Sequence, residues 1–315
     1  MQFDIILPGT NRLPGFYPWS HELDSDGFRR ILATADEAGF RGVAVSEHLA
    51  MPHHEVPRLG SYWQDALTVA AFAAAATRRI RLDFAVLVLP LHHPLRLAKA
   101  LGTIDVLSAG RLDVSIGVGH AESEFAAVDI PFERRGAITD EILVALTTLW
   151  TQEYPAHRGA RFTIEGLAIE PTPLQKPHPP IYVGGNSKPA LRRAARHDGW
   201  QPNPTDFSLE MIPPLMDYVR ARPEFTGKER TFDLNWIKSP AGVELSNGFA
   251  QTTPTALRAY RDQLVAAYLG PYRKVGITRT VAESPPAVGS EAEYCDYLRW
   301  FASEVMSEVD GSPRL

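Results

Sequence analysis

The chain has 315 residues, a formal net charge of −5, and a composition of 44% hydrophobic and 22% charged residues. These are the values of an ordinary globular protein, and because the charges form no basic block and no acidic tail, we expect neither nucleic acid nor an anionic membrane as a partner. The single cysteine, Cys295, excludes an internal disulfide framework and a cysteine-based zinc site. We see no signal-peptide pattern and no apolar run long enough to span a bilayer, so a cytoplasmic location is expected.

Short apolar runs alternate with helical patterns along the chain. Strands are predicted at residues 3–7, 42–46, 80–89, 112–118, 181–183, 232–237 and 274–281, with a sixth strand in chain order ending just before Trp200-Gln201-Pro202. Helices are predicted around residues 28–39, 65–77, 97–104, 142–150, 190–196, 211–219, 257–268 and 294–305.

This alternation predicts parallel strands, and about eight such units close into a (β/α)8 TIM barrel, with the whole of 1–315 as a single domain. An open doubly wound sheet is the alternative. Two segments fit the alternation poorly and are expected to be excursions from the barrel. They are residues 151–177, with a short strand at 161–164, and residues 222–253.

In a parallel barrel the residues that follow the strands gather at one face, where the chemistry lies. His48, His92, His93 and His120 all follow predicted strands. A metal-dependent hydrolase is one interpretation, but no His-x-His follows the first strand and adjacent histidines point in different directions, so we expect no metal site. His93, just before Pro94, is expected to be structural, while His48 and His120 are the candidates for function.

The stretch "GGNS", Gly184 to Ser187, stands between a predicted strand and a predicted helix. Glycines let a ligand approach the backbone, and main-chain N–H groups with the Ser187 hydroxyl would suit a phosphate. A tight turn with Asn186 or Ser187 as the helix cap explains the same residues equally well.

Several stretches together resemble the bacterial luciferase-like monooxygenase superfamily, in particular the branch assigned to the deazaflavin coenzyme F420. They are "VAVSEHLAMP", "VLVLPLHHPLRLAKALGTIDVLSAGRL", "GVGHAESEFAAVDIPFERRGAITDEILVALTTLW", "EPTPLQKPHPPIYVGGNSKPALRRAARHDGW" and, more faintly, "YLRWFASEVM". The resemblance implies a luciferase-like TIM barrel, usually dimeric, with a flavin or deazaflavin across the mouth of the barrel. The segment from Gln201 to about Gly289 matches poorly.

The resemblance also implies roles for particular residues. His48 would lie near the reactive ring, and a bulge in the third strand, often with a cis non-proline peptide, would support the ring near Ala85 and Val86. The loop after the fifth strand would bind the cofactor phosphate through Gly184, Gly185, Asn186 and Ser187.

His120 departs from the pattern of related sugar-phosphate dehydrogenases, in which a glutamate acid falls about where His120 stands. The resemblance therefore argues against a sugar-phosphate substrate and leaves His120 as a candidate proton donor or substrate contact.

The function implied is that of an oxidoreductase that uses F420 for hydride transfer to or from a small organic substrate. Two alternatives stay open. One is a two-component monooxygenase that uses FMNH2 supplied by a separate reductase, and the other is a protein that binds a flavin without turnover. A homodimer is expected on the resemblance alone.

Overall fold

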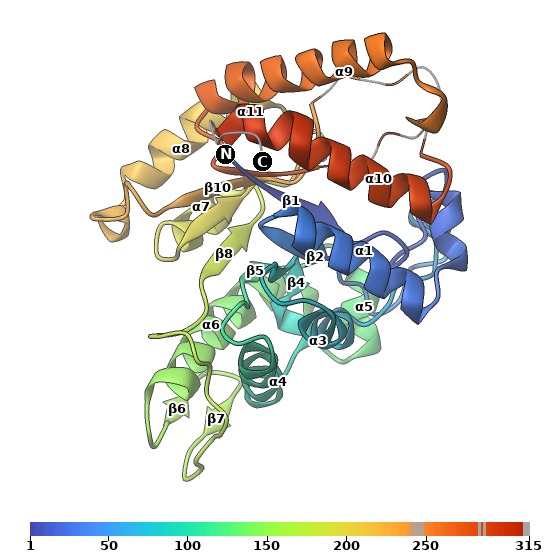
Figure 1. The fold of residues 1–315 in the computed structure, drawn as a ribbon. Coiled ribbons are helices and arrows are strands. Elements are labelled where there is room, and N and C mark those ends of the chain that lie inside the picture. Colours follow the sequence, from blue (N-terminus) through green and yellow to red (C-terminus); the bar gives the residue numbers. More distant parts are fainter. Residues whose placement is uncertain (241–242, 244, 246–248, 283–284, 286–287, 311–315) are drawn as a thin grey trace.

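A computed structural model of the chain describes residues 1–240, 243, 245, 249–282, 285 and 288–310. Parallel strands form a barrel that helices surround (Figure 1). The barrel strands are β1 (Gln2–Ile6), β2 (Gly42–Val45), β3 (Arg81–Phe84), β4 (Leu87–Val88), β5 (Val114–Gly117), β8 (Ile181–Gly184), β9 (Gly199–Gln201), β10 (Asp233–Trp236) and β11 (Arg279–Val281). The predicted TIM barrel is confirmed.

Closure of the barrel depends on β3 and β4, which are two halves of one strand position. The sheet order is β3-β2-β1-β11-β10-β9-β8-β5-β4, with parallel pairing throughout. Leu82 of β3 bridges to Leu112, just before β5, and β4 continues the same contact with Leu87 opposite Ile116. The nine strand segments therefore occupy eight positions of a barrel, with the two ends of the sheet in contact.

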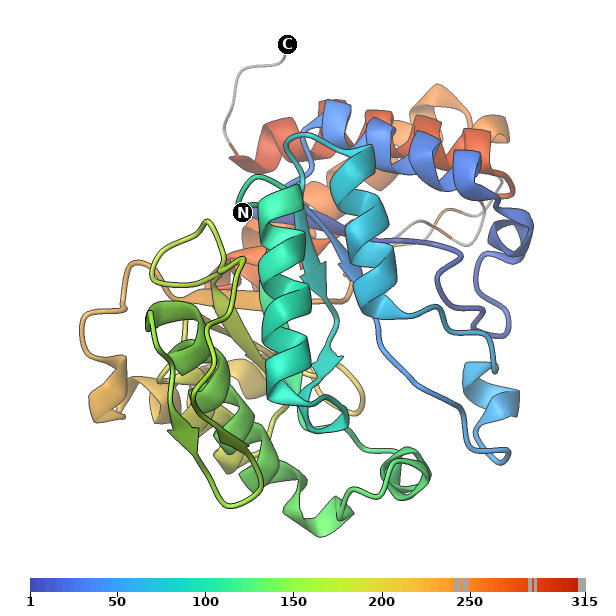
Figure 2. The same cartoon turned by 90° about the horizontal axis from the view of Figure 1, so that it is seen from below.

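Most of the helices cover the outside of the barrel with an apolar face toward the strands, whereas the short helix Val56–Leu59 has no buried residue. They are α1 (Ser25–Ala38), α2 (Val56–Leu59), α3 (Ala66–Ala76), α4 (Pro94–Leu107), α5 (Glu122–Ala127), α6 (Arg135–Thr151), α7 (Lys188–Ala194), α8 (Ile212–Arg220), α9 (Pro254–Ala267), α10 (Glu291–Phe301) and α11 (Ser307–Asp310). Figures 1 and 2 both show α10, near the end of the chain, beside α1. Within the described residues, no helix is long and apolar enough to cross a membrane.

Several predicted boundaries are wrong. Residues 80–89 do not form one strand, since Ala85 and Val86 interrupt it. Residues 274–276 are not part of a strand, because the helical segment after α9 continues to Lys274 and a turn follows; Thr278 hydrogen-bonds the main chain of Gln2 and Leu234, and the strand itself is Arg279–Val281. Trp200 and Gln201 lie within the sixth barrel strand, β9, and not after it.

The expected excursion at 151–177 is a hairpin outside the barrel. Its strands, β6 (His157–Arg158) and β7 (Thr163–Ile164), pair antiparallel, so the predicted strand at 161–164 has a partner that the sequence pattern did not indicate. The second expected excursion, 222–253, contains β10, and its residues 241–242, 244 and 246–248 lie outside the described part of the chain.

A cluster of buried charges fills the amino-terminal end of the barrel. Arg279 is fully buried and pairs with Asp83 and, at 2.7 Å, with Asp4. Arg41 and Arg81 hold Asp113 at 2.5 and 2.6 Å. Burial raises the pKa of Asp83, whereas for Asp113 the neighbouring arginines outweigh burial and the pKa is lowered. Because function lies at the opposite, carboxyl-terminal face of such barrels, we assign this cluster to the stability of the fold.

Candidate active site

The loop after β2 carries the residue pair at the centre of the candidate site. His48 lies in this loop with 11% of its side chain exposed, and its Nδ1 is 2.9 Å from Oε2 of Glu124 on α5. The other oxygen of Glu124 accepts hydrogen bonds from the main-chain N–H groups of Leu49, at 2.6 Å, and Ala50, at 3.2 Å. One carboxylate thus fixes both the loop and the imidazole.

The charge of Glu124 decides the tautomer of His48. Burial raises the pKa of Glu124, but the hydrogen bonds from His48 and from the backbone of Leu49 and Ala50 outweigh it, and the net pKa is lowered. An ionised carboxylate only accepts hydrogen bonds, so Nδ1 of His48 carries the proton toward Glu124. When His48 is neutral, its Nε2 is therefore a free base at the mouth of the barrel.

A second histidine lies next to the first. The rings of His48 and His120 are 5.5 Å apart and perpendicular. Burial and the proximity of His48 lower the pKa of His120, so this ring is mostly neutral at pH 7. The two histidines that the sequence singled out are thus brought together.

The other two histidines after strands have structural partners. Nε2 of His92 is 2.8 Å from the buried Glu47, which also accepts a hydrogen bond from the N–H of Val88. His93 is the N-cap of α4, where its Nδ1 accepts from the N–H of Leu95 at 3.3 Å. The structural role predicted for His93 is confirmed. Separately, within the described residues no three His, Cys, Asp or Glu side chains are grouped so that they could hold a metal ion.

The interruption of the third strand shapes the barrel mouth. The peptide bond between Ala85 and Val86 is cis, at the position where the resemblance placed such a bond. The side chain of Val86 packs over the ends of β5 and β8, because a Cβ on Gly117 would come within 2.5 Å of it and a Cβ on Gly184 within 2.9 Å. Only glycine leaves room for Val86 at these two positions, so Val86 packs tightly against the ends of β5 and β8.

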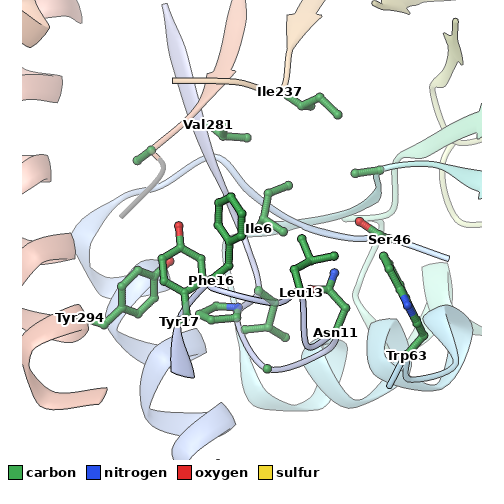
Figure 3. A pocket seen from close by; sticks show the side chains of 15 residues that line it. Ile6, Asn11, Leu13, Phe16, Tyr17, Ser46, Trp63, Ile237, Val281 and Tyr294 are labelled. Atoms are coloured by element: carbon green, nitrogen blue, oxygen red, sulfur yellow. The ribbon is translucent and has the colours of Figure 1, made fainter. Parts of the chain in front are cut away.

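A cavity of about 210 Å³ lies over the ends of β1, β2, β10 and β11 (Figure 3). Its apolar walls come from residues that include Ile6, Leu7, Leu13, Ala85, Ile237 and Val281. Asn11, Ser46 and Trp63 lie along one side in Figure 3, and Phe16, Tyr17 and Tyr294 along the other. Neither His48 nor His120 lines the cavity. Trp63 does, and the centre of its ring is 4.6 Å from the centre of the His48 ring.

Comparison with known proteins gives the family. The sequence profile described as luciferase-like monooxygenase matches residues 1–284. The chain belongs to the luciferase-like monooxygenase family. Membership makes this protein an oxidoreductase or monooxygenase, as the resemblance implied.

Both curated and solved relatives are similar along most of their length. The FMNH(2)-dependent dimethylsulfone monooxygenase of Pseudomonas putida is 31% identical over 254 residues, which are 76% of this chain and 67% of that enzyme. The crystal structure of monooxygenase RslO1 from Streptomyces bottropensis superimposes with a TM-score of 0.74 at 26% identity, covering 97% of this chain and 99% of the other. Another structure is that of the coenzyme F420-dependent tetrahydromethanopterin reductase from Methanopyrus kandleri, with a TM-score of 0.70 at 14% identity. The match covers 98% of this chain and 99% of the other, and it shows the shared fold.

The stretch "GGNS" is only partly free to bind a ligand of this luciferase-like barrel. The N–H of Gly185 donates to the carbonyl of Gln201 at 3.1 Å, which corrects the expectation that it is available for a phosphate. Asn186 exchanges two hydrogen bonds with the backbone of Asn203, and Ser187 caps α7 with a bond of 3.4 Å to the N–H of Ala190. Within the described residues, the main-chain N–H groups of Asn186 and Ser187 have no partner.

Sequence reasoning missed three parts of the site. Glu124 stands in the quoted stretch "GVGHAESEF" but was not singled out, although an acidic residue in the first turn of a helix after a barrel strand was a usable signal. Trp63 and Asn11 pair through an antiparallel bridge between two loops, for which the sequence carries no local pattern.

Proposed function

We propose that this luciferase-like protein transfers a hydride between coenzyme F420 and a small organic substrate, with His48 moving the accompanying proton. The observation that carries the proposal is the hydrogen-bonded pair of His48 and ionised Glu124, next to Trp63 in the cavity wall. A hydride transfer to a carbonyl, or from an alcohol, needs an acid or base for the oxygen, and a histidine oriented by a carboxylate is such a group. The resemblance to the F420 branch supports the same choice.

The residues at the mouth fit a flat tricyclic ring and a phosphate. The surface of Ala85 and Val86 would support the ring, next to a cavity wide enough for a neighbouring substrate. The unpartnered N–H groups of Asn186 and Ser187, with the Ser187 hydroxyl, would hold the phosphate. When bound, the deazaflavin supplies or accepts the hydride.

The chain's own residues then handle the proton. In the direction of alcohol oxidation, Nε2 of His48 accepts the hydroxyl proton, while Nδ1–H stays with Glu124. The negative charge of Glu124 stabilises the imidazolium that forms. Because His48 does not itself line the cavity but contacts Trp63, which does, we expect a bridging water to carry the proton between them. His120, mostly neutral at pH 7, can pass the proton on to solvent.

An FMNH2-dependent monooxygenase is the second candidate. It is favoured by the name of the relative from Pseudomonas putida, which is 31% identical, and by the monooxygenase structure at 26% identity. The largely apolar cavity also suits a reaction from which water must be excluded. In that case a separate flavin reductase would be a partner.

Titration of the purified protein separates the two candidates. Fluorescence is followed while oxidised F420 or oxidised FMN is added, and in a second series the reduced cofactors are added without oxygen. We expect saturable binding of F420 with an affinity at least tenfold tighter than that of FMN. The reverse preference would favour the monooxygenase, and binding of neither cofactor would contradict both candidates.

The Ser187→Ala variant tests the phosphate site. We expect weaker cofactor binding by about 1–3 kcal/mol, because a hydrogen bond to a charged phosphate is lost. The matched control is Ser290→Ala, which removes the same kind of helix cap from α10, where Ser290 accepts from the N–H of Glu293 at 3.2 Å. Equal affinities of Ser187→Ala and wild type, with both folded, would show that Ser187 only caps its helix.

We also propose a homodimer in which α3 and α4 form the interface. In its support, α4 ends in Leu107, which is 62% exposed, and small alanines dominate α3. Light scattering at micromolar concentration should give about twice the monomer mass of 34.8 kDa. Leu107→Arg should shift the mass toward the monomer, whereas Leu174→Arg, on the excursion and 54% exposed, should not. A wild-type monomer across this range would contradict the proposal.

A further inference from the structure

The wall of the cavity is mostly apolar, and its polar groups belong to Asn11, Ser46, Trp63, Tyr17 and Tyr294. Among the described residues that line it, none carries a charged side chain. Most of the wall is aliphatic or aromatic, so a charged ligand would lose its hydration there without a compensating partner. The described part of the cavity therefore selects for a neutral, mainly apolar molecule. By volume, 210 Å³ accommodates roughly seven to ten non-hydrogen atoms.

Besides the buried indole N–H of Trp63, two hydrogen-bonding side chains in this wall have no protein partner among the described residues. Within the described part of the chain, neither the hydroxyl of Ser46 nor the amide of Asn11 makes a hydrogen bond, and both residues line the cavity. Figure 3 shows them on the same side as Trp63. Ser46 directly follows β2, and Ala85 follows β3, which pairs with β2, so the polar side of the cavity borders the surface of the third-strand bulge.

The opposite side of the cavity is aromatic. Phe16, Tyr17 and Tyr294 lie there, from the loop after β1 and from α10 (Figure 3). Phe16 is 51% exposed, so this side also faces the solvent. A ligand with one polar end and an apolar body would match this arrangement with its polar end toward Ser46 and Asn11.

We infer that the substrate is a small neutral molecule with a single carbonyl or hydroxyl group, which Ser46 and Asn11 hold beside Ala85 while its apolar body lies against Phe16 and Tyr17. The inference rests on the proposed function, because it takes the surface of Ala85 as the support of the cofactor ring. It goes further in naming the class of substrate and the two residues that orient it. Ser46 and Asn11 are positioning residues, since a hydroxyl and an amide only hold the group that reacts.

The test measures binding of matched probes by calorimetry or ligand-observed NMR. Acetophenone has a carbonyl, and ethylbenzene has the same skeleton without it. Benzoate and 1-phenylethylamine are similar in size but charged at pH 7. We expect wild-type protein to bind acetophenone most tightly of the four, and at least tenfold more tightly than either charged probe.

Two variants separate hydrogen bonding from packing. Ser46→Ala should weaken the binding of acetophenone by about three- to tenfold and leave the binding of ethylbenzene unchanged. Asn11→Leu should have the same effect. Leu13→Ala removes an apolar part of the same wall and should weaken the binding of both probes to the same extent. Equal losses for the two probes in Ser46→Ala and Asn11→Leu, tightest binding of a charged probe, or no binding of any probe would overturn the inference.

The same titrations, made with and without bound cofactor, separate this inference from the proposed function. If neither F420 nor FMN binds while acetophenone shows the expected pattern, the proposed function fails and the cavity's preference for a neutral polar-ended ligand stands. If a cofactor binds and Ser46→Ala does not distinguish acetophenone from ethylbenzene, the function stands and the substrate class is wrong.

Discussion

Replacing His48 with glutamine should lower turnover by about 10²- to 10⁴-fold while the melting temperature changes little. Glutamine keeps a side chain of similar reach but cannot take up or release a proton. The measurement is the single-turnover rate of the cofactor-loaded variant, beside its melting temperature. A sharp fall in melting temperature with an unchanged rate per folded, loaded molecule would make His48 a purely structural residue.

Glu124→Gln tests whether the carboxylate sets the tautomer of His48. The amide oxygen can still accept from Leu49 and Ala50, so the loop after β2 should stay in place. The amide NH2 group then faces Nδ1 of His48 and forces it to become an acceptor, which puts the ring proton on Nε2. The free base is lost, and we expect a fall in rate close to that of His48→Gln.

The double variant sharpens this test. Because both single changes disable the same base, the rate of His48→Gln with Glu124→Gln should be close to that of either single variant. Multiplicative losses would mean that the two residues act independently.

The hydrogen-bonded pair of His48 and Glu124 also predicts a pH dependence of stability. The lowered pKa of Glu124 adds stability above the carboxyl's usual pKa of about 4.5, and this stability is lost as the pH falls through the lower folded-state value.

Replacing Arg279 with methionine should reduce the free energy of unfolding by about 3–5 kcal/mol. Methionine fills much of the volume of the arginine stem, so the loss comes from the charge. Without the guanidinium, Asp4 and Asp83 lose their shared partner in a fully buried place, and the nearby Asp113, at 3.7 Å from Nη1, loses part of its own compensation.

Urea unfolding measures this effect, with Arg220→Met as the control. Arg220 pairs with Asp217 at 3.2 Å on the surface, where both side chains are more than half exposed, and its loss should change the free energy by no more than about 0.5 kcal/mol. A loss from Arg279→Met as small as that of the control would show that the cluster is not needed for stability. The result bears on the fold alone, since the cluster lies at the end of the barrel opposite the candidate site.

Much of the barrel was predictable because buried parallel strands are apolar over their whole length. The strand at 42–46 and the helix at 65–77 agree with β2 and α3 to within a residue or so, since every residue of β2 and one face of α3 meet the core. The predicted ends of strands were wrong where main-chain hydrogen bonding, and not amino-acid composition, decides where the strand begins. Residues 274–277 have a strand-like composition, but helical and turn hydrogen bonds continue into them from the segment after α9.

The candidate site divides in the same way. The sequence placed His48 and His120 at the barrel mouth because each follows a predicted strand, and strand ends of a parallel barrel share one face. It could not show that Glu124, 76 residues beyond His48, holds the imidazole and fixes its free nitrogen. Nor could it show that Val86 packs against Gly117 and Gly184, at the ends of two other strands. The periodicity of the sequence determined which residues reach the mouth, because burial acts on each element separately. Only the closed barrel decided which of them touch, because contacts between distant segments depend on how all eight strand positions pack together.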